Sequence, residues 1–229
     1  KQIGNYLNRM LHYMNMCMNQ YNMISIKEFE YDSFVPGSRL GIALNVQTGI
    51  DRKNIQAAVL SAIKEITKEY NVGYSDIAVL FPVRKNTALK YYFQYWLTSA
   101  LDNEGIPYSL ISTAENGTQK KVRYSQTKGM VISTIDSSLG LDFKAVIVAG
   151  LFPFNYVFSN NSGKIKINSW DEVNSLDQIE QEQIQIQMRK LYTACSRARD
   201  ILYIISDLQG DSPMELLLTE PIKEKNDGE

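Results

Sequence analysis

Apolar residues follow two patterns along the chain, and these patterns predict its secondary structure. Some segments repeat apolar positions every three or four residues, which is the spacing of a helix with one buried face. These segments are residues 3–21, 51–70, 89–101 and about 176–196. Other segments are short and largely apolar, as in strands that are covered on both faces of a parallel sheet. The predicted strands are residues 41–46, 77–81, 130–135, 145–150 and 201–205, together with a strand that follows the turn at residues 105–108 and ends near residue 111.

Helices and strands alternate in this prediction, and that alternation favours one fold class. It predicts an α/β fold with an open, mainly parallel, doubly wound sheet and helices on both faces. The helical spacing also predicts which side chains of residues 89–101 face the core. These are Leu89, Tyr92, Phe93, Trp96, Leu97, Ala100 and Leu101.

Composition bounds the size of the domain and the kind of partner. With 229 residues, of which 44% are hydrophobic, the chain can bury a sizeable core. We predict a single domain over residues 1–219 and a charged tail over residues 220–229. The formal net charge is -1, so any contact with nucleic acid must come from a few local groups.

The same composition argues against metal and membrane functions. The two cysteines lie outside any metal-type spacing, and His12 is the only histidine, so we predict no metal site. No apolar run approaches the roughly 18 residues that a membrane span needs. We therefore expect a cytoplasmic protein without a membrane partner.

The segment over residues 189–206 carries the first candidate site. Its helical stripe breaks into an apolar strand just after Arg197. An arginine fixed at such a junction presents a fork of donors that suits phosphate. The simpler interpretation is that Arg197 solvates carbonyl groups at the helix end or pairs with Asp200.

This segment resembles motif VI of the UvrD/Rep-type superfamily 1 helicases, in which R-x-L-Y-x-A-x-T-R-A-K precedes a strand. The positions that fit are Arg189, Leu191, Tyr192, Ala194, Ser196 in place of threonine, Arg197 and Ala198. The resemblance implies that Arg197 reaches the γ-phosphate of ATP bound between two motor domains. It also implies that the guanidinium faces a cleft and not the core.

A second segment, residues 134–150, joins two predicted strands. Gly140 permits close approach of a ligand to the backbone, the hydroxyl of Thr134 can bind a phosphate, and a carboxylate such as Asp142 can accept from a ribose hydroxyl. Without further information this is an ordinary strand, loop and strand.

The same segment resembles motif V of those helicases, T-x-H-x-x-K-G-L-E-F followed by an apolar strand and a glycine. Thr134, Gly140, Leu141, Phe143 and Gly150 are in register. The departures are Asp136 for histidine, Leu139 for lysine and Asp142 for glutamate. An aspartate at position 136 also resembles the other large branch of superfamily 1, so the subfamily stays open. The resemblance implies nucleotide contacts from Gly140 and Asp142, and DNA contacts from Thr134, Asp136 and Ser137.

A third segment, residues 76–108, resembles the strand I-A-V-L-x-R-x-N, helix and G-I-P-Y turn of the same family. Arg84 and Asn86 keep the R-x-N spacing but fall two residues later than in the family. Arg84 follows a predicted parallel strand, where α/β sheets place ligand contacts, and the resemblance implies that it binds nucleotide. The alternative is a solvated loop arginine.

The sequence lacks the G-x-x-x-x-G-K-[ST] loop that cradles the phosphates of ATP. The resemblance therefore implies the RecA-like second motor domain of a longer ATP-dependent helicase, and the isolated chain is predicted to be inactive. The implied partners are ATP with Mg²⁺, a first motor domain that supplies the phosphate loop and magnesium ligands, and single-stranded DNA or RNA. Two alternatives remain: a catalytically inactive RecA-like module that binds nucleic acid or protein, and an unrelated nucleotide-binding α/β regulator.

Overall fold

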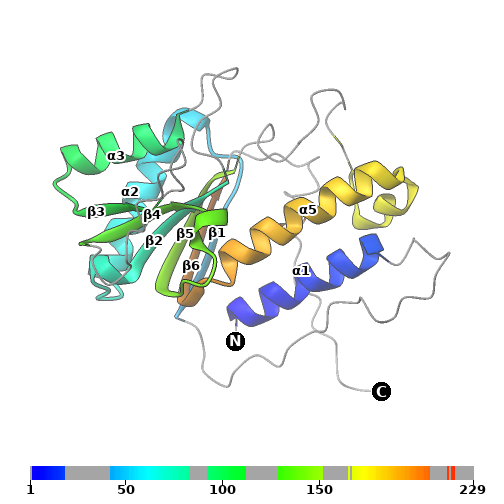
Figure 1. Ribbon diagram of the computed structural model, residues 1–229, viewed down its shortest axis with the longest axis horizontal. Coiled ribbons are helices and arrows are strands. Elements are labelled where there is room, and N and C mark those ends of the chain that lie inside the picture. The colour runs from blue at the N-terminus through cyan, green and yellow to red at the C-terminus, as the bar shows by residue number, and fades with distance from the viewer. Residues whose placement is uncertain are drawn as a thin grey trace.

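A six-stranded parallel sheet forms the centre of the molecule in the computed structural model (Figure 1). The structure describes residues 2–18, 42–82, 92–111, 128–151, 165, 167–206, 216 and 218–219, without the side chains of residues 16–18, 171 and 174. Within these residues the strands lie in the order β1-β6-β5-β2-β4-β3, and each neighbouring pair is parallel. The strands are β1 (Ala43–Gln47), β2 (Ile77–Phe81), β3 (Tyr108–Ile111), β4 (Met130–Thr134), β5 (Phe143–Leu151) and β6 (Ala198–Ser206).

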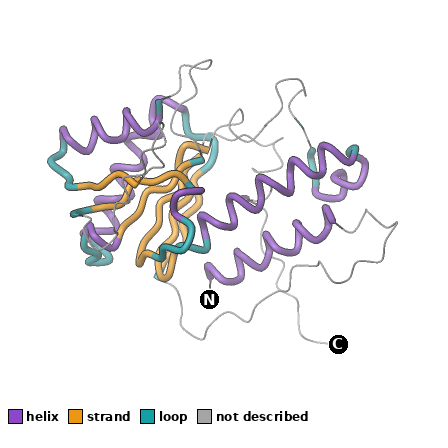
Figure 2. Tube along the Cα trace, in the orientation of Figure 1, coloured by secondary structure: helices purple, strands orange, loops and turns teal. Residues whose placement is uncertain are grey.

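Helices cover both faces of the sheet, which confirms the predicted doubly wound α/β class (Figure 2). One face is covered by α1 (Gln2–Met18) and α5 (Gln178–Cys195). The other face is covered by α2 (Ile55–Lys68) and α3 (Phe93–Asn103). Short 3₁₀ helices, each named η, precede or follow these elements: η2 (Arg52–Asn54), η3 (Tyr74–Asp76), η5 (Asp136–Ser138) and η6 (Trp170–Ser175).

The central strands are apolar over most of their length because each one feeds two cores. In β2 all five residues are buried. Ala78 and Leu80 point into the core under α1 and α5, whereas Val79 and Phe81 point into the core under α2 and α3. A strand with alternating polar residues could not satisfy both faces. This two-sided burial explains why continuous apolar runs identified the central strands from the sequence.

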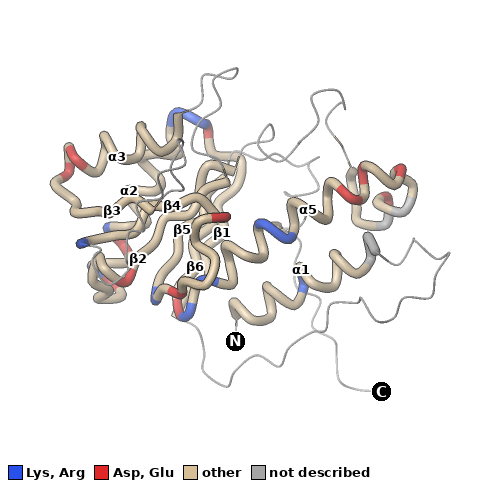
Figure 3. The backbone as a smooth tube through the Cα atoms, in the orientation of Figure 1, with Lys and Arg blue, Asp and Glu red and all other residues tan. Residues whose placement is uncertain are grey.

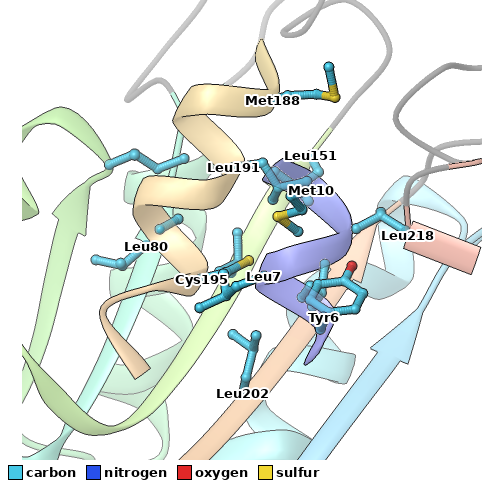
Figure 4. Packing of buried hydrophobic residues seen from close by; sticks show 14 of the residues in the cluster. Tyr6, Leu7, Met10, Leu80, Leu151, Met188, Leu191, Cys195, Leu202 and Leu218 are labelled. Atoms are coloured by element: carbon cyan, nitrogen blue, oxygen red, sulfur yellow. The ribbon is translucent and has the colours of Figure 1, made fainter. Parts of the chain in front are cut away.

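Helix α1 packs against α5 over the first of these cores (Figure 4). Figure 4 shows Leu7 and Met10 of α1 among side chains of α5, which include Leu191 and Cys195. Near the other end of the chain, Leu218 is buried in the same core, and its carbonyl oxygen accepts from Arg9 at 3.3 Å. The predicted tail over residues 220–229 lies outside the described residues.

The inward stripe predicted for α3 was too wide. Phe93, Leu97 and Ala100 are buried, but Tyr92 and Trp96 are each 37% exposed, and Leu89 lies outside the described residues. Positions 93, 97 and 100 share one helical face, whereas Trp96 lies about 70° to one side of it and Tyr92 is the N-cap residue of the helix. A single sheet face cannot bury a stripe of that width, so two large aromatic side chains remain accessible.

The start of α5 is fixed by a capping box. Asp177 accepts from the backbone nitrogen of Glu180 at 2.8 Å, and the Glu180 carboxylate accepts from the backbone nitrogen of Asp177 at 3.2 Å. One turn later, the buried amide of Gln181 donates to the carbonyl oxygens of Val173 and Leu176. These bonds satisfy polar groups that would otherwise be buried without partners, and they set where the helix begins.

Gly129→Ala should destabilise the fold more than its matched control, Gly105→Ala. Both glycines have positive φ, at +76° and +66°. A Cβ at position 129 would lie 2.2 Å from the Pro107 carbonyl oxygen, whereas nothing lies within 4 Å at position 105. Urea denaturation should show a loss of about 1–2 kcal/mol for Gly105→Ala and about 3 kcal/mol or more for Gly129→Ala. Equal losses would mean that the backbone at Pro107 can shift to make room for the added Cβ without any loss of stability.

Candidate functional site

The parallel sheet has two distinct edges, and the candidate residues divide between them. Thr134 pairs in register with Phe81, so β2 and β4 end together at what we call the carboxyl edge. Phe143 pairs with Ala198, so β5 and β6 begin together at the amino edge. Residues 135–142, the β4–β5 link, therefore run about 20 Å back along the strand direction from one edge to the other.

Arg197 lies at the amino edge, between α5 and β6, and contacts the end of the β4–β5 link. Its Nε donates to the Thr193 carbonyl oxygen at 3.2 Å, which lies in the last turn of α5. One terminal nitrogen donates to the Leu141 carbonyl oxygen at 3.3 Å, and the other donates to Ser196 Oγ at 3.1 Å. The Asp142 carboxylate lies 3.4 Å from the first of these nitrogens. The guanidinium is thus held in one orientation by two segments of the chain.

The environment of Arg197 differs from the open cleft that the sequence implied. Its side chain is only 21% exposed, whereas that of Asp142 is 60% exposed. The carbonyl oxygens at the end of α5 favour a cation at this position, because the helix dipole is negative there. Solvation of carbonyl groups, the simpler interpretation from the sequence, therefore describes part of what this arginine does.

Gly140 lies in the β4–β5 link, just before the residues that Arg197 contacts. Its φ is +80°, a backbone conformation that side chains with a Cβ rarely adopt. No atom lies within 4 Å of the position that a Cβ would take. Glycine is therefore required here by backbone conformation and not by close packing within the chain, and this side of the backbone is open.

Thr134 and Ser137 lie together at the carboxyl edge. Thr134 Oγ1 donates to Ser137 Oγ at 2.9 Å and accepts from the Ser137 backbone nitrogen at 3.3 Å. The adjacent Asp136 is 64% exposed, and its carboxylate lies 3.4 Å from Lys190 Nζ on α5. The three residues predicted to contact DNA thus form one tight turn, with a lysine beside it.

Lys190 is a residue that the sequence analysis missed. It lies two helical turns before Arg197, on the side of α5 that faces the β4–β5 link. The spacing between Lys190 and Arg197 is visible in the sequence. The pairing of Lys190 with Asp136 is not, because it depends on how the chain folds. Together Lys190 and Arg197 connect α5 to both ends of the link. Figure 3 shows charged segments on α5 and in the adjoining loop.

Two further groups were candidates for this site, Arg84 and Cys195. Arg84 lies outside the described residues, so its predicted role stays a prediction. Burial raises the pKa of the Cys195 thiol, which therefore stays protonated although it lies close to Arg197 in the sequence. Among the residues that the structure describes, no three His, Cys, Asp or Glu side chains are grouped to hold a metal ion. No described helix is both long and apolar enough to cross a membrane.

Comparison with known proteins assigns the chain to no family, since it matches no protein family and no curated protein. Among solved structures, it is similar to a crystal structure described as the C-terminal domain of a possible DNA helicase from Lactobacillus plantarum WCFS1. The two chains are 19% identical, the alignment covers 80% of this chain and 84% of that one, and the TM-score is 0.42. This similarity assigns no role to any residue.

Replacing Arg197 with alanine should lower stability, because the change removes three hydrogen bonds: two to Thr193 and Ser196 at the end of α5, and one to Leu141 that joins this helix end to the β4–β5 link. Hydrogen bonds from charged groups are worth about 1.5–3 kcal/mol when buried, and partial exposure here reduces the expected loss to about 1–2 kcal/mol. Arg199→Ala is the matched control, since that side chain is exposed. Urea denaturation of both variants measures the difference. Equal stability would mean that the contacts of Arg197 contribute nothing to the fold.

Proposed function

We propose that this chain is the second motor domain of an ATP-dependent superfamily 1 helicase or translocase. The observation that supports the proposal most directly is the contact between Arg197 and the segment from Gly140 to Asp142. The two segments resemble motif VI and motif V independently, and neither resemblance depends on the two segments being in contact. In the folded chain they meet at one edge of the sheet.

Arg197 serves in this proposal as an arginine finger for ATP that is held mainly by a first motor domain. Negative charge spreads over the oxygens of the transferred phosphoryl group, and a rigid, planar cation stabilises it. The four contacts of Arg197 within its own domain fix the plane of the fork before ATP arrives. Such preorganisation removes the cost of orienting the group during the reaction.

Asp142 and Gly140 complete the nucleotide side of the site. The exposed Asp142 carboxylate can accept from a ribose hydroxyl, and the open backbone at Gly140 allows a nucleotide to approach closely. The ion pair between Asp142 and Arg197 does not prevent this, since the Asp142 carboxylate is 60% exposed and water screens the pair on that side. A triphosphate carries more charge than a carboxylate and competes for the same guanidinium.

Mg²⁺ would be held by the first motor domain in this proposal. The described part of this chain groups no three acidic or imidazole side chains, and its sequence contains no lysine-bearing phosphate loop. When bound, the ion neutralises charge on the β- and γ-phosphates. Among the described residues, this chain would contribute the guanidinium of Arg197, the Asp142 carboxylate and the backbone at Gly140.

The carboxyl edge supplies the nucleic-acid contact. The hydroxyl of Ser137, which accepts from Thr134 and keeps its own proton, can donate to a phosphate oxygen of a single strand, DNA or RNA. Asp136 itself would repel phosphate, but it holds Lys190 beside the two hydroxyls. Its role in binding is then to position a cation.

One observation favours the alternative, a catalytically inactive module that binds nucleic acid or protein. Arg197 directs hydrogen bonds from all three of its nitrogens to groups of its own domain. An arginine kept for stability would show the same contacts. The two proposals differ in what happens to ATP turnover when the arginine is changed.

In a protein that joins this domain to its first motor domain, Arg197→Ala should reduce ATP turnover about 10³-fold or more. Arg197→Lys should restore little of it, because a point charge does not reproduce the planar fork. Arg199→Ala is the control and should keep the parent rate, and residues 1–229 alone should show no turnover. Steady-state phosphate release measures all four. Turnover of Arg197→Ala within a few-fold of the parent would favour the inactive module.

The isolated domain should bind single strands weakly and with a strong salt dependence, because only part of the strand track is present. Thr134→Val together with Ser137→Ala should weaken binding without changing the salt slope, since neither hydroxyl carries charge. Lys190→Gln should instead reduce the slope by about 1. Fluorescence anisotropy of a labelled oligonucleotide measures these effects. The control pair is Thr67→Val with Ser175→Ala, and an equal loss in that pair would contradict the assignment.

A further inference from the structure

A pocket of about 490 Å³ lies between the start of α2 and the first turns of α3. It is lined by Arg52, Lys53, Ile55, Gln56, Phe93, Trp96 and Leu97. Its volume falls within the range of sites that bind small organic ligands. None of these residues belongs to the segments that contain Thr134 or Arg197, so the pocket is separate from the site described above.

The pocket opens near the carboxyl edge of the sheet. The backbone nitrogen of Ile50 donates to the carbonyl oxygen of Ser206 at 3.0 Å, which places the approach to α2 beside the end of β6. The ring of Phe93 lies 5.2 Å from that of Phe81, the last residue of β2. Parallel α/β sheets bind ligands at this edge. The pocket lies on the α2 and α3 face, whereas Ile135 of the β4–β5 link packs into the core under α5.

The walls of the pocket are aromatic and firmly held. Phe93 and Leu97 are buried, and Trp96, which is 37% exposed, presents its indole at the rim. The Gln56 side chain donates to the Trp96 carbonyl oxygen at 2.7 Å and so ties α2 to α3. Because this bond uses the backbone of residue 96, a change of its side chain leaves the bond in place.

The mouth of the pocket is basic. Arg52 and Lys53 are both exposed, and Figure 3 shows the basic segment at the start of α2 next to α3. Lys53 lies 3.5 Å from Asp51, but both side chains are at least 70% exposed, so water screens this pair. The local balance is positive in a chain whose net charge is -1.

We propose that this pocket binds one nucleotide of a single strand, with the base against Trp96 and the phosphate beside Arg52 and Lys53. A neutral apolar ligand would use the walls but would not use the positive charge of Arg52 and Lys53 at the mouth. An acidic peptide would use the cations but not the flat indole. A nucleotide uses both, since each base has a face that stacks on aromatic rings and each phosphate attracts basic side chains.

This inference deepens the proposed function and rests on it for the identity of the ligand as a single strand. It adds a second contact for the strand at the carboxyl edge, apart from the turn that contains Thr134 and Ser137. A single nucleic-acid strand bound at both places would cross the carboxyl ends of the central β-strands. Contact between a base and the indole should change the fluorescence emission of Trp96. The turn at Thr134 contains no tryptophan and gives no such signal.

The chain has two tryptophans, Trp96 and Trp170, and this allows a selective test. Trp170 is 4% exposed and stacks on Tyr13 with ring centroids 4.2 Å apart, so Trp170→Phe keeps an aromatic partner. In that variant all tryptophan emission comes from Trp96. Titration with an oligothymidylate of about ten nucleotides should quench the emission. Arg52→Gln and Lys53→Gln should each weaken binding several-fold and reduce the salt slope by about 1.

Lys68→Gln, at the far end of α2, is the matched control and should change neither quantity. Thr134→Val with Ser137→Ala should weaken binding but keep the quenching at saturation. If Trp170→Phe does not fold, Trp96→Leu in the parent chain should lower affinity about tenfold by anisotropy.

Three outcomes would overturn the inference. Binding seen by anisotropy without any change in Trp96 emission would remove the pocket and leave the proposed function standing. Quenching by thymidine monophosphate but not by the oligonucleotide would assign the pocket to a free nucleotide. Absence of binding by both readouts would remove the nucleic-acid part of the proposed function, and this inference with it.

Discussion

An all-parallel sheet that is covered on both faces imposes one constraint on which the rest of this structure depends. Every strand ends at the carboxyl edge, so the chain must return to the amino edge before the next strand can begin. Most returns of this kind use a helix and a dozen or more residues. Between β4 and β5 the chain makes the return in residues 135–142, with only the short helix η5 in between.

A link this short has little structure of its own and depends on its neighbour for support. Helix α5 provides that support through Lys190, which pairs with Asp136, and Arg197, which donates to Leu141. The capping box at Asp177 fixes where α5 begins, and packing against α1 fixes how it lies on the sheet. Contacts far from the candidate site therefore determine where the guanidinium of Arg197 is placed.

The sequence predicted those elements whose burial leaves a pattern in residues that are close together in the chain. The central strands were evident because two-sided burial leaves no polar positions in β2. The sequence could not show how much of α3 the sheet would cover, so Trp96 was placed in the core although it is at the rim of a pocket. It also could not reveal the close approach of Gly129 to Pro107, which depends on the pairing of β3 with β4.

The candidate site shows the same division between local and tertiary information. Resemblance picked out Arg197 and the Gly140 segment one at a time, but the carbonyl oxygen of Leu141 carries no side-chain signal at all. That bond gives Arg197 a structural role as well as the proposed catalytic one, and the two roles are compatible. A guanidinium has five donors in a rigid plane, so some of them can hold the group to its own domain while the plane stays oriented. An arginine without such anchors would lose more conformational entropy on meeting a phosphate, and its charge would be less well placed for the transition state.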